Sequence, residues 1–398
     1  MPDHEPLTYQ NSGVDYNLMD PFKIACQRAA QTTSRNLFGK FLRYGLEVSE
    51  PPGTRGETAY SIDIQQATHS KAFPAFRLAS VIEGLGTKNE VADQIWQLNL
   101  KADLAYRLAS VYDPSLFRNI GIDNVASVIN DLSAVGAIPT NFALFIATSS
   151  SSWFKDQGKT NALIQGTVEG CNIAKCSWGN GETQTLRGPI ADGHFVLAGS
   201  ANGLVFPNHN GKMNSENLTE GDDITLFASS GPHTNGITFL RNEVAPRLTN
   251  VYETLLSDGK TYAEALLTPT KIYAPLIDAL YNSQIRIKYA SPITGHGWRK
   301  IMRADRNDLI YVIDQIPATP PIFEKVQEVT RMSDQQMYSD FNMGIGFAIM
   351  TEYYYTDRLH RIAEKAGFKI AGVGHIESGP KKVVIVPLGI ELTDLNIR

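Results

Sequence analysis

The sequence predicts a two-domain protein of the α/β or α+β class, and three observations support this. The chain has 398 residues, which is more than one ordinary hydrophobic core accommodates. Patterns typical of strands and of helices alternate in both halves of the chain. A polar, turn-rich segment at 207–223 separates the halves. We therefore expect an N-terminal domain over residues 1–210 and a C-terminal domain over residues 211–398.

The N-terminal half begins with an irregular stretch and then alternates between strands and helices. In the helix expected at 120–140, apolar residues recur at three- and four-residue intervals, and Gly136 marks the end. In chain order we expect a helix at 21–33, a strand at 76–83, a helix after 88 that runs to about 112, the helix at 120–140, a strand at 141–150, a helix at 161–176, a polar turn at 178–188, and one long bent strand or a strand pair at 193–206.

The C-terminal half continues the alternation. Its first strand, at 223–230, runs into the loop SSGPHTNG at 229–236, and a helix follows at 237–248. The loop is therefore expected at a strand-to-helix junction. The remaining expected elements are a helix at 269–283, a turn at 294–297, a strand at 309–314, a helix at 320–330, a strand at 341–350, a helix at 353–366, and closing strands at 370–376 and 381–388.

Composition excludes several classes of protein. The chain has 36 Lys and Arg against 41 Asp and Glu, a net charge of −5, and it has no basic cluster, which argues against a nucleic-acid surface. No window approaches the roughly 20 apolar residues of a membrane-spanning helix. The N-terminus has no basic segment followed by an apolar run. We therefore expect a cytoplasmic protein with neither nucleic acid nor membrane as its partner.

A glycine-rich turn, GLGTK, follows one predicted strand and precedes a helix. Gly84 and Gly86 would let phosphate oxygens approach the backbone, and Lys88 would supply a positive charge. A structural role is also open, because Thr87 followed by Glu90 has the spacing of a capping box. Both interpretations can hold, since a capped helix N-terminus still attracts anions.

Three oxygen-bearing residues share the helix expected at 120–140. Asp123 and Asn130 are seven residues apart and lie on nearly the same face, whereas Asp131 lies about 80° further round. Together with Glu83, directly before the glycine-rich turn, these groups suit Mg²⁺, which binds one or two carboxylates together with phosphate oxygens. Asp123 is an equally good candidate for a helix N-cap.

Two further polar motifs could carry catalytic groups. Glu182 lies in the glycine-flanked turn expected at 178–188 and could act as a metal ligand or a general base. The loop SSGPHTNG holds His233 and Asn235 beside two glycines, where backbone N–H groups at a helix N-terminus suit an anion. Helix capping would explain Asn235 but not His233. Because the loop is polar and glycine-rich, we expect its side chains to face a cleft.

Taken in order, these motifs resemble those of AIR synthase, phosphoribosylformylglycinamidine cyclo-ligase. SSGPHTNG and FNMGIG are fairly specific for this family, whereas GLGTK and the adjacent pair Asn130-Asp131 are shared more widely in its ATP-binding superfamily. The resemblance covers almost the whole chain. The matching strings are NSGVD, GLGTK, GIDNVASVINDL, EGCNIAKCSWGNGET, SSGPHTNG, LLTPTKIY, ITGHG and MYSDFNMGIGFAI.

The resemblance implies a fold, a reaction and a set of site residues. The N-terminal domain would contribute strands to a β-barrel shared by a homodimer, and a C-terminal α/β domain would pack against it. ATP, with Mg²⁺, would phosphorylate the formyl amide oxygen of a phosphorylated ribonucleotide, formylglycinamidine ribonucleotide, and a nitrogen would then displace phosphate and close the imidazole ring. The implied catalytic residues are Lys88, Glu182, His233 and Asn235; the implied nucleotide-binding residues are Gly84, Gly86, Thr87, Lys88, Asn130, Asn342 and Gly344; the implied metal ligands are Glu83, Asp131 and Asp123.

Several positions depart from the family pattern. Glu83 stands where an Asp is usual, and Gln27 stands where a lysine is expected in the first helix. In the turn that is usually TGGG the third residue is His296, and the Glu-Asn pair that usually follows is replaced around Arg299-Lys300. Two alternatives follow. One is a related enzyme with the same ATP cleft, such as a thiamine-monophosphate or selenophosphate-type kinase, and the other is a non-catalytic paralogue that binds nucleotide.

Overall fold

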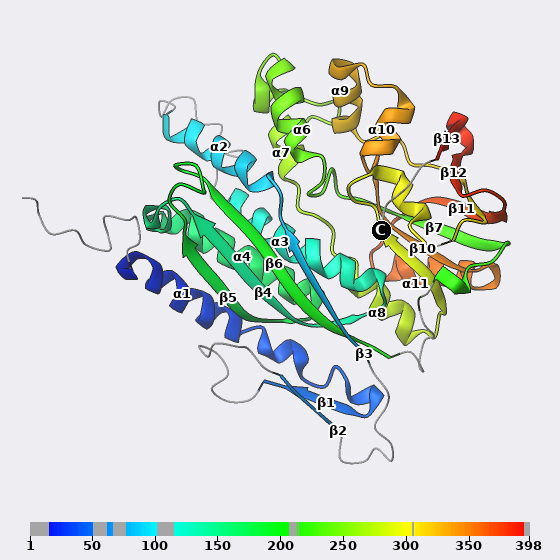
Figure 1. The fold of residues 1–398 in the computed structure, drawn as a ribbon, viewed down its shortest axis with the longest axis horizontal. Helices are drawn as coiled ribbons and strands as arrows, with labels where there is room; N and C mark the ends of the chain where they lie inside the picture. The colour runs from blue at the N-terminus through cyan, green and yellow to red at the C-terminus, as the bar shows by residue number, and fades with distance from the viewer. Residues whose placement is uncertain are drawn as a thin grey trace, which may run out of the picture.

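Two sheets dominate the part of the chain that the structure describes. The computed structural model describes residues 16–50, 62–66, 77–101, 115–206, 213, 215–304 and 306–393. Its N-terminal half forms a four-stranded sheet and its C-terminal half a seven-stranded sheet, which lie side by side with helices packed around them (Figure 1). The predicted mixed α/β class is confirmed. The predicted boundary at residue 210 falls among residues 207–212, outside the described part, and stays a prediction.

The four-stranded sheet is mixed. Strands β3, β6 and β4 pair antiparallel, and β5 is parallel to β4. The strands expected at 76–83 and 141–150 are confirmed, and the segment at 193–206 is one long strand. The order across the sheet is β3 (Arg77–Gly84), β6 (Phe195–Val205), β4 (Ile138–Thr148) and β5 (Ser177–Thr185).

Strand β5 corrects the polar turn that we expected at 178–188. It lies at one edge of the sheet, and β4 is its only partner among the strands that the structure describes. Asn180, Gly181 and Glu182 in its middle are exposed. Glycine and polar side chains are tolerated there because an edge strand is paired on one side only. The turn-like composition of this segment therefore reflects its edge position.

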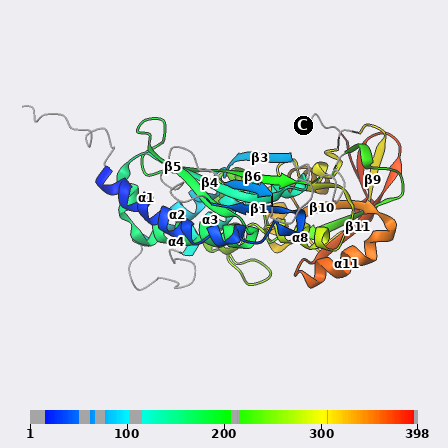
Figure 2. The ribbon, with the colours of Figure 1, turned by 90° about the horizontal axis from the view of Figure 1, so that it is seen from below.

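Three helices cover one face of this sheet: α1 (Tyr16–Gln31), α3 (Ser115–Ala134) and α4 (Gln157–Ala174). The helix expected at 120–140 is α3, but it ends at Ala134. Gly136 adopts φ +73°, which L side chains avoid, and turns the chain toward β4. Figure 2 shows these helices on one side of the strands.

Helices α3 and α4 pack backbone against backbone at two glycines. A Cβ atom built on Gly166 would lie 1.8 Å from the carbonyl oxygen of Arg118, and one on Gly121 would lie 2.5 Å from that of Leu163. Both distances are far below van der Waals contact, so these positions accept glycine alone unless the helices separate.

Gly166→Ala is therefore expected to destabilise the protein by about 1–3 kcal/mol, the usual cost of overpacking, despite the better helix propensity of alanine. Urea unfolding followed by circular dichroism would measure this. Gly158→Ala is the matched control, because Gly158 is exposed in the first turn of the same helix. Equal stability of the two variants would contradict the close packing.

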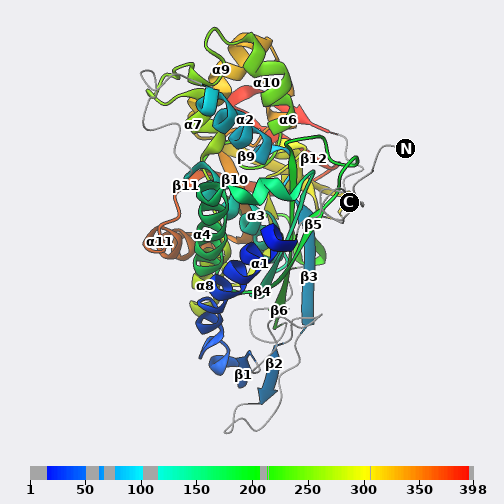
Figure 3. The same ribbon diagram turned by 90° about the vertical axis from the view of Figure 1, so that its left-hand side faces the viewer.

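Over most of its area, the other face of the four-stranded sheet is not covered by any described element, as Figure 3 also shows. At one end of this face, Leu204 is buried against residues 37–48. The rest of this face presents apolar side chains to solvent: Leu78, Ile82 and Val196 are 57%, 77% and 46% exposed. The strand register places all three on this face. Among the described strands the sheet is open, with β3 and β5 at its edges, so the described part of one chain does not close the predicted β-barrel.

The seven-stranded sheet is antiparallel except where β12 pairs parallel to β9. Helices α8 (Ala274–Asn282) and α11 (Thr356–Lys365) pack on the face that carries Phe227. Ile224 and Leu226 face the opposite way, into a core that also includes residues of the N-terminal half. The order is β13 (Ile390–Leu392), β12 (Lys382–Ile385), β9 (Leu309–Gln315), β11 (Ile370–Ser378), β7 (Asp222–Ala228), β10 (Ile345–Glu352) and β8 (Ile287–Pro292).

Several expected elements of the C-terminal half have different bounds. The helix expected at 269–283 begins only at Ala274, because residues 268–273 are held in an irregular conformation by side chains of the N-terminal half. The strand expected at 341–350 begins at Ile345, after a turn in which Gly344 adopts φ +97°. The helix expected at 237–248 consists of α6 (Ile237–Phe239), a π turn and a 3₁₀ turn.

The remaining elements complete the two halves. Helix α2 (Lys88–Lys101) follows the glycine-rich turn, and its predicted continuation to 112 lies outside the described residues. Helix α9 (Pro321–Thr330) was expected. Short elements that the sequence did not indicate are β1 (Leu46–Ser49), β2 (Asp63–Gln66), α7 (Tyr262–Leu267), β8, α10 (Asp334–Asp340) and β13. A search of the described residues finds no helix that combines the length and the apolar character needed to cross a bilayer.

Candidate active site

The glycine-rich turn and the SSGPHTNG loop meet where the two halves of the molecule join. The hydroxyls of Thr87 and Thr238 lie 2.8 Å apart. A Cβ atom on Gly86, which has φ +78°, would lie 3.8 Å from the carbonyl oxygen of Thr234. The predicted capping box is not the arrangement observed, because Thr87 bonds across the junction and the Glu90 carboxylate lies against His194. Gly84 and Gly86 are exposed at this junction.

Lys88 points inward rather than out of the turn. Its ammonium lies 2.8 Å from the carboxylate of Asp123 and donates a 2.7 Å hydrogen bond to the carbonyl oxygen of Thr268. Both charged side chains are fully buried. Burial lowers the pKa of Lys88 and raises that of Asp123, and the ion pair opposes both shifts. The charge of Lys88 is thus directed into the core.

Asp123 and Asn130 do share one helix face, as their spacing predicted, but that face meets protein backbone. Oδ1 of Asp123 accepts hydrogen bonds from the backbone N–H and the hydroxyl of Thr270, at 2.7 and 2.5 Å. Asn130 donates to the carbonyl of Lys271 and accepts from the N–H of Tyr273, both at 2.8 Å. Asp123 therefore does not fit a metal ligand, and the amide of Asn130 is already engaged.

His233 lies inside the loop rather than in an open cleft, which corrects the expectation that its side chain faces a cleft. It is 3% exposed and adopts φ +61°. Its Nε2 accepts a 3.3 Å hydrogen bond from the N–H of Ser230, which leaves the proton of the neutral ring on Nδ1. Gly346 permits this position, because a Cβ there would lie 2.5 Å from Cε1 of His233.

The environment of His233 opposes a positive charge. Burial, with Lys88 and Lys271 adding repulsion, lowers the pKa of His233 to about 3. The folded protein therefore keeps this ring neutral down to that pH, whereas the same side chain in the unfolded chain takes up a proton near its ordinary pKa of 6.5. Below pH 6.5 the unfolded state binds more protons, so acidification favours unfolding.

His233→Asn should therefore lose less stability on acidification than the wild type. Asparagine tolerates positive φ and does not titrate. From pH 7 to pH 4.5 the difference should be about 2–3 kcal/mol, because each pKa unit corresponds to ~1.4 kcal/mol. His296→Asn is the control, since His296 has φ +73° but is exposed. Urea unfolding at both pH values is the measurement, and parallel pH profiles for wild type and His233→Asn would contradict the burial of a neutral ring.

Asn342 and Gly344 support the loop from the other side. Asn342 is buried and donates a 2.8 Å hydrogen bond to the carbonyl of Gly231. The backbone N–H of Gly344 donates to the Asn342 side chain at 3.0 Å, and its carbonyl accepts from Ser229 at 2.8 Å. Asn235 is half-buried in the same loop, and its Oδ1 lies beside Gly295 of the turn expected at 294–297.

Two carboxylates and two cations gather beside the glycine-rich turn. Burial raises the pKa of Asp131, Glu83 raises it further, and Arg303 and Lys300 lower it. Lys300 belongs to the segment around Arg299-Lys300 where the sequence departs from the family pattern, and Arg303 follows three residues later. Lys300 lies 169 positions from Asp131, in a different half of the chain, so the sequence pattern alone does not indicate that the two are close.

Glu83 and Asp131 offer carboxylate oxygens of the kind that Mg²⁺ binds, although Lys300 and Arg303 already lie near Asp131. The mutual repulsion of the two carboxylates is relieved by a cation, and Mg²⁺ commonly binds one or two carboxylates together with phosphate oxygens. No group of three or more His, Cys, Asp and Glu side chains in the described ranges could hold a metal by itself. A metal here would therefore depend on oxygen ligands from a bound phosphate.

Glu182 lies apart from these groups within the chain. By strand register Glu182 lies in the same row across the sheet as Gly84. The two residues are three strands apart, because β3 and β5 are the opposite edges of the sheet. At ~4.8 Å for each spacing this is about 14 Å. Glu182 lines a cavity of about 170 Å³ between α1 and β5 that also includes Gln27, one of the positions that departs from the family.

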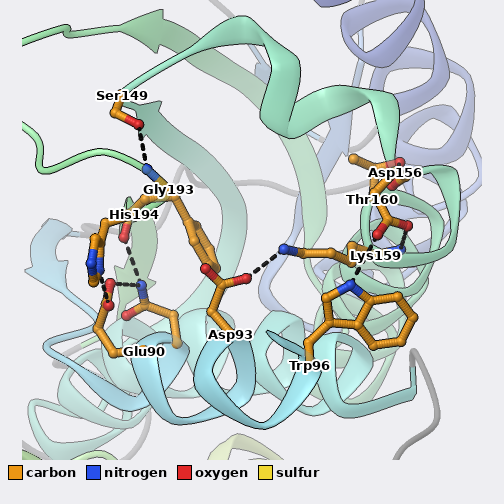
Figure 4. Close-up of polar contacts among 11 residues, drawn as sticks. Glu90, Asp93, Trp96, Ser149, Asp156, Lys159, Thr160, Gly193 and His194 are labelled. Atoms are coloured by element: carbon orange, nitrogen blue, oxygen red, sulfur yellow. Dashed lines mark hydrogen bonds and ion pairs between the residues drawn. The ribbon is translucent and has the colours of Figure 1, made fainter. Parts of the chain in front are cut away.

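Helix α2 is anchored by a second polar network, drawn in Figure 4. Glu90 contacts His194, Asp93 forms a buried ion pair with Lys159, and Trp96 donates a 3.0 Å hydrogen bond to Asp156. These contacts hold the helix at the ends of the sheet strands, so the glycine-rich turn before it has a fixed place. The sequence had indicated only Glu90 in this network.

The fold is that of a group of two-domain α/β proteins with known structures. Superposition on the hydrogenase maturation protein HypE of E. coli gives a TM-score of 0.55 at 16% identity, covering 92% of this chain and 96% of HypE. Thiamine-monophosphate kinase of Stenotrophomonas maltophilia gives 0.56 at 16% identity, with coverages of 93% and 97%. At such identities the likeness concerns the fold alone.

Sequence comparison defines the family. Residues 93–205 match the model for the N-terminal domain of AIR synthase related proteins, and residues 219–387 match that for the C-terminal domain. Phosphoribosylformylglycinamidine cyclo-ligase of Clostridium tetani is 32% identical over 77% of this chain and 84% of its own length. That of Methanococcus maripaludis is 29% identical over 93% of this chain and 92% of its own. The chain belongs to the AIR synthase family.

Proposed function

We propose that this protein catalyses the ATP-dependent cyclisation of formylglycinamidine ribonucleotide to aminoimidazole ribonucleotide, a ligase reaction of de novo purine biosynthesis in the cytoplasm. The observation that carries the proposal is the junction of the glycine-rich turn with the SSGPHTNG loop, joined by Thr87 and Thr238 at 2.8 Å. Relatives that carry the cyclo-ligase name at about 30% identity support the same reaction.

The residues at the junction suit distinct parts of this reaction. Gly84 and Gly86 are exposed and Thr87 is half-buried, and the backbone of this turn would offer N–H groups to ATP phosphates. Asn235, half-buried at the junction, can donate to or accept from the amide that is phosphorylated. Glu83 and Asp131 would hold Mg²⁺, which supplies positive charge next to the phosphate oxygens. Lys88, His233, Asn130, Asn342 and Gly344 support the turn and the loop from within, and Glu182 remains a proposed general base or ligand.

We also propose that the uncovered face of the four-stranded sheet forms a homodimer. An apolar face of this kind is covered in stable proteins, and a second copy could close the open sheet into a shared barrel. Glu182 lies on this face by register, so dimerisation could bring a copy of it toward the junction of the partner.

Ile82→Glu is expected to convert the dimer to a monomer, because it places a charge in the middle of the proposed apolar interface. Sedimentation velocity at micromolar concentration measures the change. Leu255→Glu is the control, since Leu255 is 67% exposed but lies in the C-terminal half, away from this sheet. A monomeric wild type, or an unchanged dimer in Ile82→Glu, would contradict the proposed interface.

The function is tested by incubating the purified protein with ATP, Mg²⁺ and formylglycinamidine ribonucleotide and detecting ADP, phosphate and the aminoimidazole product. Product formation supports the cyclo-ligase. Phosphorylation of thiamine monophosphate in a parallel reaction would favour the kinase alternative. Nucleotide binding without turnover of either substrate would identify a non-catalytic paralogue.

A further inference from the structure

Residues 268–273 form a segment that we name the interdomain strap. It has no regular secondary structure, and its backbone is bonded by side chains. From the N-terminal half, Lys88 donates to the carbonyl of Thr268, Asp123 accepts from Thr270, and Asn130 bonds both Lys271 and Tyr273. These contacts span the length of the strap. They replace the hydrogen bonds that a helix or strand would have supplied.

The same strap contacts the loop that holds His233. The hydroxyl of Ser230 donates a 2.5 Å hydrogen bond to the carbonyl of Pro269. The hydroxyl of Tyr273 donates to the carbonyl of Ala228 at 2.8 Å, and the Tyr273 ring lies against that of His233 with 6.4 Å between ring centres. One short segment therefore connects helix α3 to the loop.

The burial of these groups restricts the strap to one position. Lys88, Asp123 and Tyr273 are fully buried, and Thr270 is 5% exposed. In such surroundings a displaced carboxylate or ammonium would be left without a partner, which is costly. The strap cannot shift without breaking the ion pair or its hydrogen bonds to α3.

We propose that the interdomain strap is a positioning element, through which Asp123, Lys88 and Thr270 fix the His233 loop against the glycine-rich turn. This inference rests on the proposed catalytic role of that loop. The sequence suggested Asp123 and Lys88 as ligands of metal and phosphate. In this proposal they act instead by holding the backbone of the strap in place. It also accounts for the match of LLTPTKIY to the family, a motif to which the sequence analysis had assigned no role.

The sharpest probe is Thr270→Val, which removes the hydroxyl bond to Asp123 but keeps the backbone bond, the shape and the ion pair. Thr270→Ser should restore the bond. Thr167→Val is the matched control, because Thr167 is also buried and its hydroxyl bonds only within α4, to Leu163. Native-state hydrogen exchange of the loop amides is the readout, with Ser229 and Ser230 as reporters, since both donate hydrogen bonds in the folded loop.

We expect Thr270→Val to increase the hydrogen-exchange rate of the loop amides about tenfold, because the loss of one hydrogen bond makes local opening more favourable by roughly that factor. Thr270→Ser should show wild-type exchange, and Thr167→Val should lower the melting temperature without changing the loop. In the cyclisation assay, Thr270→Val should lower kcat more than it raises KM for ATP.

Two results would overturn the proposal. One is unchanged loop exchange in Thr270→Val, and the other is equal acceleration in Thr270→Val and Thr167→Val, which would indicate general loss of stability. Exchange is measured without substrate, so it does not depend on the reaction. A protein that fails to cyclise the ribonucleotide yet shows the expected exchange pattern would refute the proposed function and retain the positioning role of the strap.

Discussion

Asp123→Ala should lower the free energy of unfolding by about 3–5 kcal/mol, the cost of removing one partner of a buried ion pair. The carboxylate is fully buried, 2.8 Å from Nζ of Lys88, and also accepts two hydrogen bonds from Thr270. Truncation leaves a buried ammonium without counter-charge and a backbone N–H without acceptor. Urea unfolding monitored by circular dichroism gives the value.

The control for this prediction is an ion pair of similar length at the surface. Arg43 and Asp278 lie 2.8 Å apart, but their side chains are 33% and 25% exposed. Asp278→Ala should cost only about 0–1 kcal/mol, because water replaces much of the lost interaction. Lys88→Met combined with Asp123→Leu should be less destabilising than Asp123→Ala, since no charge is left buried. If Asp123→Ala costs no more than Asp278→Ala, the pair does not hold the strap.

Asp131→Asn should lower kcat by roughly 10²–10³, the range for losing one preorganised electrostatic group. Phosphoryl transfer spreads negative charge over the phosphate oxygens, and the metal that offsets it needs carboxylate ligands. Asparagine keeps the shape of the side chain, and it relieves the repulsion from Glu83 that raises the pKa of Asp131. We therefore expect stability to be unchanged or slightly higher.

The measurement is kcat as Mg²⁺ is titrated, in wild type and Asp131→Asn, with Mg²⁺ affinity in the presence of a non-hydrolysable ATP analogue measured separately. Asp308→Asn is the control, because Asp308 is an exposed carboxylate paired with Arg306, remote in sequence from the turn. Superimposed Mg²⁺ curves for wild type and Asp131→Asn would show that Asp131 is not a metal ligand and that its end of α3 serves only as scaffold.

Local patterns predicted much of the fold. Helices with long apolar periodicity, such as α3 and α4, and strands flanked by turn residues, such as β3 and β7, lie close to their predicted positions. Whether such a segment forms a helix or a strand depends on residues that are close to one another in the sequence, so the local pattern predicts it. Strand β5 was missed because its exposed, glycine-containing residues are stabilised by pairing to β4 rather than by their own preference.

The candidate site was predicted in part. The glycine-rich turn and the SSGPHTNG loop were recognised as polar motifs at strand-to-helix junctions, and the structure joins them through Thr87 and Thr238. The direction of individual side chains was not predictable. Lys88 and Asp123 bear the charges expected of a phosphate and metal site, yet the two side chains form an ion pair with each other inside the core.

The sequence by itself determined the two-domain α/β class, the order of its major elements and the family to which its motifs belong, because propensity, periodicity and glycine placement act over a few neighbouring residues. Tertiary structure alone decided that the strap at 268–273 is irregular, that His233 is buried and neutral, and that Lys300 and Arg303 lie near enough to Asp131 to lower its pKa. These features depend on burial and on charges brought together from distant parts of the chain. Desolvation and Coulomb interactions between such groups exist only once the chain has folded.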